Sequence, residues 1–127
     1  ATGLADASVD AVLSVDALWM VWNKQAALAE VARILRPGGR FVFTTWEPSY
    51  LDHRKLLAAA GFTVAVREET PGWLERQNEV YARIVAQEDV LKAELGPGAE
   101  VILTEARETP SVLAGTPRLV LAATAPS

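Results

Sequence analysis

The 127-residue sequence predicts an α/β fold, in which strands and helices alternate before a helical segment and one last strand. Two observations support this fold class. Hydrophobic spacing switches between the strand and the helix period along the first half of the chain. The composition, 50% hydrophobic and 22% charged, is ordinary for a globular protein. We expect one domain with three parts, residues 1–69, 70–116 and 117–127.

The first strand and helix are predicted from residues 9–36. Residues 9–15 (VDAVLSV) are short, rich in β-branched side chains and almost continuously apolar, which predicts a strand buried on both faces. Asn23 is a good N-cap for a helix over residues 24–36. The Arg-Pro-Gly-Gly run at residues 36–39 is expected to end that helix in a turn.

Two further strands and one helix follow. Residues 40–46 (RFVFTTW) are dense in aromatic and β-branched side chains, which favours a strand. Ser49 and Asp52 resemble a capping box that opens a helix through Ala60. Residues 62–68 are the next strand. The order strand, helix, strand, helix, strand requires right-handed crossovers and a mainly parallel sheet.

The second half is predicted to be helical. Thr70 and Pro71 suit a helix start, and Gly96-Pro97-Gly98 breaks the pattern. Residues 99–107 are ambiguous between helix and strand, with helix preferred, and residues 118–124 form a final strand. One helical stripe is traced by Leu74, Tyr81, Ile84, Val85, Leu91 and Leu95.

Charge and composition exclude several classes of protein. The net charge of −4 and the absence of a basic run do not suit a nucleic-acid binder. Without cysteine there are no disulfides, thiolate metal sites or cysteine nucleophiles. A lone histidine among dispersed carboxylates gives no metal-ligand spacing. No apolar run approaches the roughly 18 residues of a membrane span, and we expect a cytoplasmic protein.

Four segments resemble the class I S-adenosylmethionine-dependent methyltransferases. Residues 6–10 (DASVD) are similar to the D-x-S-F-D entry into the family's fourth strand, and residues 14–18 (SVDAL) to the S-x-x-A-L turn leaving it. Residues 28–39 (LAEVARILRPGG) are similar to the L-x-E-x-x-R-V-L-R-P-G-G run before the fifth strand. Residues 57–62 (LAAAGF) look like the junction into the sixth. The run at 28–39 is the most specific because it is long and ordered.

The resemblance implies a partial Rossmann-like methyltransferase sheet, with strands equivalent to the family's fourth to seventh and a lid-like helical insert before the last. It also implies S-adenosylmethionine as methyl donor and a small-molecule acceptor. The family's G-x-G-x-G loop is not found in this sequence. We therefore expect a truncated, C-terminal portion of an enzyme that does not bind the donor alone.

A second interpretation stays open from the sequence. The chain could be a non-catalytic methyltransferase-like binding module, complete as it stands. In that case the exposed edge of the sheet, at the first strand, would pair with a second copy to form a homodimer.

Candidate site residues follow from the resemblance and from the rule that ligands bind beyond the carboxyl ends of strands. The cofactor side is expected to include Ala1, Ser14, Val15 and Asp16. Thr45 and Glu47, at the end of the next strand, could converge with them. The acceptor side is expected to include Trp19, Met20, Trp46, Trp73 and Tyr81. Aromatic faces among these could stabilise the sulfonium charge of the donor.

Each candidate also has a structural interpretation. Asp16 is a weak catalytic candidate, since it could orient a substrate or simply cap backbone amides in a turn. The tryptophans could fill core contacts, Trp22 most clearly, and Tyr81 could do the same. His53, the only histidine, is expected on a solvated helix surface rather than as a base.

Overall fold

The computed structural model describes residues 1–127 and divides into two units, Ala1–Thr70 with Arg118–Ser127, and Pro71–Pro117. The first unit contains β1 (Val9–Val15), the short 3-10 helix η1 (Leu18–Met20), α1 (Lys24–Ile34), β2 (Leu35–Trp46), α2 (His53–Ala59), β3 (Thr63–Glu69) and β4 (Arg118–Thr124). The second contains α3 (Trp73–Ala86), α4 (Glu88–Leu95), the 3-10 turn η2 (Gly96–Gly98) and α5 (Ala99–Leu113).

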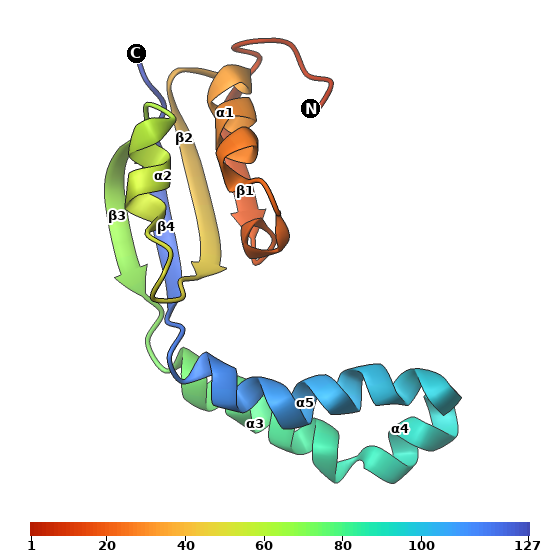
Figure 1. Ribbon diagram of the computed structural model, residues 1–127. Coiled ribbons are helices and arrows are strands. Elements are labelled where there is room, and N and C mark those ends of the chain that lie inside the picture. The colour runs from red at the N-terminus through yellow and green to blue at the C-terminus, as the bar shows by residue number, and fades with distance from the viewer. The chain divides into compact units, whose positions relative to one another are not determined.

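The four strands of the first unit form one sheet in the order β1-β2-β4-β3 (Figure 1). β1 and β2 are parallel, whereas β4 runs antiparallel to both β2 and β3. The last strand therefore inserts between the second and the third. This arrangement confirms the α/β fold class and the helical insert before the final strand.

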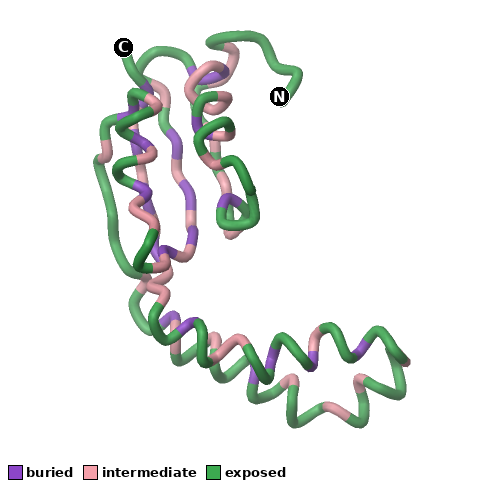
Figure 2. The backbone as a smooth tube through the Cα atoms, viewed as in Figure 1, coloured by how far each residue is buried: buried purple, intermediate pink, exposed green.

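Helices α1 and α2 cover one face of this sheet (Figure 1). Side chains alternate along β2, so that Phe41, Phe43 and Thr45 are buried while Thr44 and Trp46 are only half-buried. Figure 2 shows the same alternation along β2 and β4. The core on the helix side contains Leu28 of α1, Leu57 of α2, and Leu119 and Leu121 of β4. The opposite face is left partly open.

Strand β1 lies at one edge of the sheet, as expected, but the prediction that it is buried on both faces is wrong. Leu13 and Val15 are 71% and 60% exposed. The reason is that an almost continuous apolar run does not tell whether a second layer covers the strand. Here α1 and α2 cover one face only.

The Arg-Pro-Gly-Gly turn belongs to β2. Helix α1 ends at Ile34, two residues before the predicted end, because Leu35 already pairs with Val9 of β1. The next aligned pair is Ala11 with Arg40, so residues 36–39 form an irregularity in the strand. A side chain at Gly39 would come within 2.9 Å of the carbonyl oxygens of both Arg36 and Asp10. Only glycine fits there.

Helix α2 begins later than predicted. Asp52, not Ser49, is the N-cap, and its carboxylate accepts a hydrogen bond from the Arg54 amide at 3.0 Å. Residues 48–51 are instead a turn, closed by the Leu51 amide on the Pro48 carbonyl at 3.0 Å. His53 is consequently the first residue of the helix.

The helical unit packs α3 and α4 against α5. The predicted single stripe divides between α3 and α4, which are separated at Gln87, and residues 99–107 are helical as preferred. The buried side chains of this unit are Trp73, Tyr81, Ala99, Leu103, Ala106 and Leu113. None of the helices of the chain is both long and apolar enough to cross a membrane.

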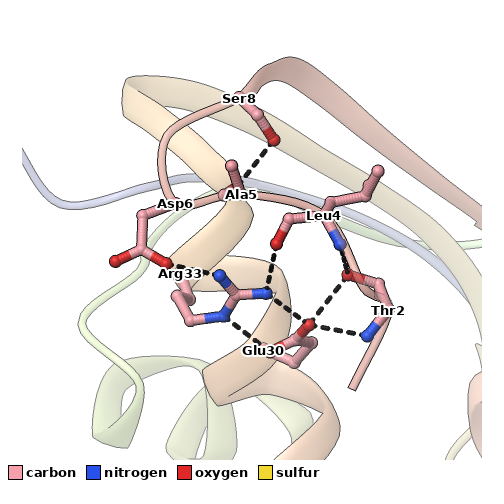
Figure 3. A network of polar contacts seen from close by, with 7 residues as sticks. All are labelled: Thr2, Leu4, Ala5, Asp6, Ser8, Glu30 and Arg33. Atoms are coloured by element: carbon pink, nitrogen blue, oxygen red, sulfur yellow. Dashed lines mark hydrogen bonds and ion pairs between the residues drawn. The ribbon is translucent and has the colours of Figure 1, made fainter.

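The exposed segment before β1 is held by polar contacts to α1 (Figure 3). Glu30 accepts hydrogen bonds from the amide and the hydroxyl of Thr2, both at 2.8 Å. Arg33 donates to the Leu4 carbonyl at 2.8 Å and pairs with both Asp6 and Glu30. Hydrogen bonds from Arg33 and Thr2 hold the pKa of Glu30 well below its ordinary value. The segment is therefore held mainly by polar contacts.

Candidate functional site

A cluster of side chains gathers at the carboxyl ends of β1 and β2. Asp16 directly follows β1, Thr44 and Trp46 end β2, and Trp19 lies in η1. Arg118 joins them because β4 is antiparallel to β2 and its first residue pairs with Trp46. We call these five residues the strand-end cluster.

The Asp16 carboxylate is fixed by two side chains. The Thr44 hydroxyl donates to Oδ1 at 2.7 Å, and Arg118 donates to Oδ1 and Oδ2 at 3.0 and 3.1 Å. The backbone of Asp16 has a φ of 51°, and its amide donates to Thr44 Oγ1 at 2.9 Å. Both carboxylate oxygens therefore bind side chains rather than the backbone amides of a turn cap.

Two indole rings stand beside this carboxylate. Trp19 and Trp46 pack edge to face, with their ring centroids 5.8 Å apart and an interplanar angle of 84°. The Trp19 indole N–H donates to the Asp16 carbonyl at 2.8 Å. The Trp46 Nε1 atom is buried and has no hydrogen-bond partner. About half of the Trp19 side chain remains exposed, so the cluster offers an aromatic surface to a ligand.

The other predicted site residues lie in different surroundings. Val15 and Met20 are exposed next to the cluster, and Ser14 is half-buried within β1. The N-terminus, with Ala1, lies at the other end of β1 from the cluster (Figure 1). Trp73 and Tyr81 belong to the helical unit, and both are buried.

One tryptophan was misjudged from the sequence. Trp22, expected to be the most clearly structural, is completely exposed. It lies in the loop between η1 and α1, where no layer of the unit covers it. Its indole ring therefore fills no core contact.

A second, buried cluster follows directly after Trp46. Glu47 is 6% exposed and accepts a hydrogen bond from the His53 amide at 2.7 Å. His53 Nδ1 lies 3.1 Å from the same oxygen, and Arg67 pairs with the other one. The imidazole packs near the Phe43 ring, with centroids 5.9 Å apart. The prediction of a solvated His53 is wrong, because the first turn of α2 faces the sheet.

Burial sets the protonation of this buried cluster. Burial lowers the pKa of His53 below 6.5, and the neighbouring Glu47 carboxylate offsets this only in part. Protonation would also place a donor on Nε2, which is buried and has no partner. For Glu47, burial alone would raise the pKa, but hydrogen bonds from the His53 amide and Arg67 outweigh it and lower the pKa. The cluster thus holds a neutral imidazole and an ionised carboxylate at neutral pH.

Sequence reasoning placed Glu47 with the site and missed Arg118 and Thr44. In the structure, Glu47 belongs to the buried cluster instead. Thr45, which is fully buried, lies on the same side of the sheet. The available signal for Arg118 was a lone charge at the start of an otherwise apolar strand. A charge in that position needs a partner, but the sequence does not identify Asp16, 102 positions away.

Comparison with known proteins supports the sequence resemblance. A family model described as a methyltransferase domain matches residues 1–43. The dimethylglycine N-methyltransferase of Parasynechococcus marenigrum (strain WH8102) is 54% identical over 41 residues. That match covers 32% of this chain and 15% of the relative, so the shared stretch is a small part of the relative's length.

Solved structures match nearly the whole chain. The [4+2]-cyclase SpnF superposes with a TM-score of 0.83 at 18% identity, over 99% of this chain and 53% of its own. Phosphoethanolamine N-methyltransferase 2 of Haemonchus contortus, solved with S-adenosyl-L-methionine, superposes with a TM-score of 0.77 at 19% identity. The match covers 98% of this chain and 35% of that protein. Geranyl diphosphate C-methyltransferase of Streptomyces coelicolor A3(2) superposes with a TM-score of 0.63 at 18% identity. The match covers 98% of this chain and 49% of that protein. Identities this low show a shared fold, and fold alone does not fix a reaction.

Proposed function

We propose that this chain is part of a class I S-adenosylmethionine-dependent methyltransferase, and that its strand-end cluster forms the acceptor side of an enzyme that methylates a small molecule. The observation that carries the proposal is the Trp19–Trp46 pair beside the fixed Asp16 carboxylate. In open α/β sheets this end of the strands is where ligands bind. The name of the curated relative, a dimethylglycine methyltransferase, supports a small amine as acceptor.

S-adenosylmethionine is the methyl donor of this family, and the residues of the cluster fit its sulfonium end. The exposed surface of Trp19 can interact with a cation. Ser14, Val15 and Asp16 would lie along the methionine part of the donor. Ala1, which the resemblance also implies on the cofactor side, lies with the N-terminus at the other end of β1 and stays a prediction.

The chemistry places modest demands on the protein. When bound, S-adenosylmethionine would supply an electrophilic methyl group, which would pass to the acceptor lone pair as the carbon–sulfur bond breaks with its electrons left on sulfur. The tryptophans and Asp16 then have to align the acceptor and keep water away. Since both oxygens of Asp16 already accept hydrogen bonds from Arg118, we assign it an orienting role.

This chain alone is not expected to bind the donor. It has no G-x-G-x-G loop to hold the remainder of the cofactor. Titration calorimetry of the 127-residue chain with S-adenosylhomocysteine should show no heat of binding. Binding in the micromolar range would contradict this part of the proposal.

The test of the proposed function uses the product of the complete reading frame that contains these residues. Transfer of tritium from methyl-labelled S-adenosylmethionine is measured with a panel of amines that includes dimethylglycine. We expect labelled product, and about tenfold less of it per unit time after Trp19→Ala, equivalent to about 1.4 kcal/mol. The matched control is Trp22→Ala, which removes a fully exposed tryptophan outside the cluster. A protein that binds the donor but labels no amine would contradict the proposal.

A further inference from the structure

Arg118 makes contact with the ends of all three other strands of the sheet unit. Its guanidinium donates to both oxygens of Asp16 after β1 and lies 5.7 Å from the centroid of the Trp46 ring at the end of β2. It also donates to the hydroxyl of Thr70, which follows β3, at 3.1 Å. One side chain thus connects the residues that carry the proposed function.

The Arg118 side chain is itself well anchored. Its backbone is fixed by the pairing with Trp46 and by a hydrogen bond from the Thr70 amide to the Arg118 carbonyl at 3.0 Å. The side chain is 20% exposed, compared with 35% for Asp16. One guanidinium nitrogen, Nη2, donates to both oxygens of Asp16, while Nη1 donates to Thr70, so the guanidinium is held at two points. A partly buried, charge-assisted contact of this kind restrains a carboxylate more than an exposed ion pair does.

The conformation of Asp16 makes this restraint necessary. A φ of 51° is uncommon for a residue other than glycine, although Asp adopts it more readily than most, and the contacts around Asp16 help to hold it there. Thr44 restrains the amide and one carboxylate oxygen. Without Arg118, the second oxygen would lose its partner and the carboxylate could rotate. The Trp46 ring would also lose the cation that packs against it.

We propose that Arg118 is a positioning residue for the acceptor site, which fixes the Asp16 carboxylate and the Trp46 ring in the orientation that methyl transfer needs. The proposal rests on the proposed function. Arg118 acts through these two residues and needs no contact with the acceptor. A lysine at this position would restore the charge but not the planar guanidinium, which donates to Asp16 and Thr70 from two different nitrogens.

The test compares Arg118→Met, Arg118→Lys and the control Arg40→Met in the product of the complete reading frame. Arg40 is an exposed arginine in the middle of β2, where it pairs with Thr124, the last residue of β4 and thus far from Trp46. We expect Arg118→Met to lower kcat at least tenfold while the Kd for S-adenosylhomocysteine changes less than twofold. Arg118→Lys should recover part of kcat, and Arg40→Met should leave it unchanged.

A double-mutant cycle separates positioning from a general structural effect. If Arg118 acts through Asp16, Arg118→Met should cost much less in an Asp16→Asn background than in the wild type. Wild-type kcat in Arg118→Met, or an equal loss in both backgrounds, would overturn the proposal.

Hydrogen exchange tests the same role without activity. Arg118→Met should speed exchange at the Asp16 and Thr70 amides, which donate to Thr44 and Arg118, and Arg40→Met should not. If the wild-type protein transfers no methyl group, the proposed function fails, and the positioning role is then decided by exchange alone. Unchanged exchange at both amides would overturn it.

Discussion

Two carboxylates lie near the end of β2, and each is bound by an arginine. Asp16 pairs with Arg118 in the strand-end cluster and keeps 35% of its side chain exposed. Glu47 pairs with Arg67 in the buried cluster and keeps 6%. Trp46 and Glu47 are adjacent in sequence, yet one belongs to the open cluster and the other contacts α2 on the helix-covered side.

The difference shows that the surroundings, rather than the ion pair itself, decide what a carboxylate can do. Around Asp16 the remaining surface is aromatic and accessible, so a ligand can approach. Around Glu47 the helix amide, the imidazole and Arg67 use the available hydrogen bonds. We therefore expect the first cluster to affect binding and catalysis, and the second to affect stability.

The largest expected effect is on stability, from Glu47→Gln. Removing the charge leaves Arg67 without its counter-ion and replaces one accepting oxygen by an NH2 group, and we expect the free energy of unfolding to fall by about 3 kcal/mol. The measurement is urea denaturation, and the matched control is Glu68→Gln on the exposed side of β3, with a change below about 0.5 kcal/mol. Equal losses for the two variants would remove the contrast between the clusters.

Asp16→Asn should give the opposite result. We expect kcat/KM for the acceptor to fall about tenfold to a hundredfold, which corresponds to about 1.4 to 2.7 kcal/mol of transition-state stabilisation. Its effect on unfolding should be clearly smaller than that of Glu47→Gln. Steady-state kinetics and urea denaturation on the same preparations check both statements. A variant that unfolds easily but keeps its kcat/KM would reverse our assignment.

The buried cluster should also make stability depend on pH. Because the pKa of His53 is lowered from 6.5 in the folded state, the unfolded chain binds more protons below that pH. Above pH 6.5, His53 therefore leaves the free energy of unfolding independent of pH. Below pH 6.5, the free energy of unfolding falls by at most about 1.4 kcal/mol for each pH unit. Unfolding curves between pH 5 and 7.5 measure this slope, and His53→Gln should reduce it. The lowered pKa of Glu47 adds a further loss below 4.5.

The smallest expected effect concerns the segment before β1. Glu30→Gln should weaken its contacts with Thr2 and speed hydrogen exchange at the amides of residues 2–7, without changing global unfolding. Glu79→Gln, in the exposed pair with Arg83 of α3, is the matched control. A cooperative loss of stability after Glu30→Gln would show that the segment is part of the folded core.

Local patterns predicted most of the sheet unit. The Asn23 cap and the apolar spacing after it define α1, and Asn23 Oδ1 does accept from the Ala26 amide at 3.0 Å. The start of α2 was misplaced because Ser49 and Asp52 are both suitable caps, and only the turn closed by Pro48 and Leu51 decides between them. The prediction that β1 is buried on both faces failed because the sequence of a strand does not show whether other elements pack on each of its faces.

The site was predicted only as far as strand ends could be recognised. Asp16, Trp19 and Trp46 follow from the rule for ligands in α/β sheets. Arg118 does not, because its place beside Asp16 depends on β4 inserting antiparallel between β2 and β3. His53 was misplaced because no local pattern shows that Glu47 is buried against the start of α2.

The bond between the Thr70 amide and the Arg118 carbonyl has a consequence for how such a protein can diverge. Glu69 at the end of β3 pairs with Leu119 near the start of β4, so these two strand ends are neighbours. A short hairpin turn could join them, and residues 71–117 stand in its place. Residues 71–117 are therefore an insertion at a single point, whose length and sequence can change without shifting the register of the two strands. We expect relatives to differ most in this segment, and to tolerate its exchange as a cassette while the sheet stays the same.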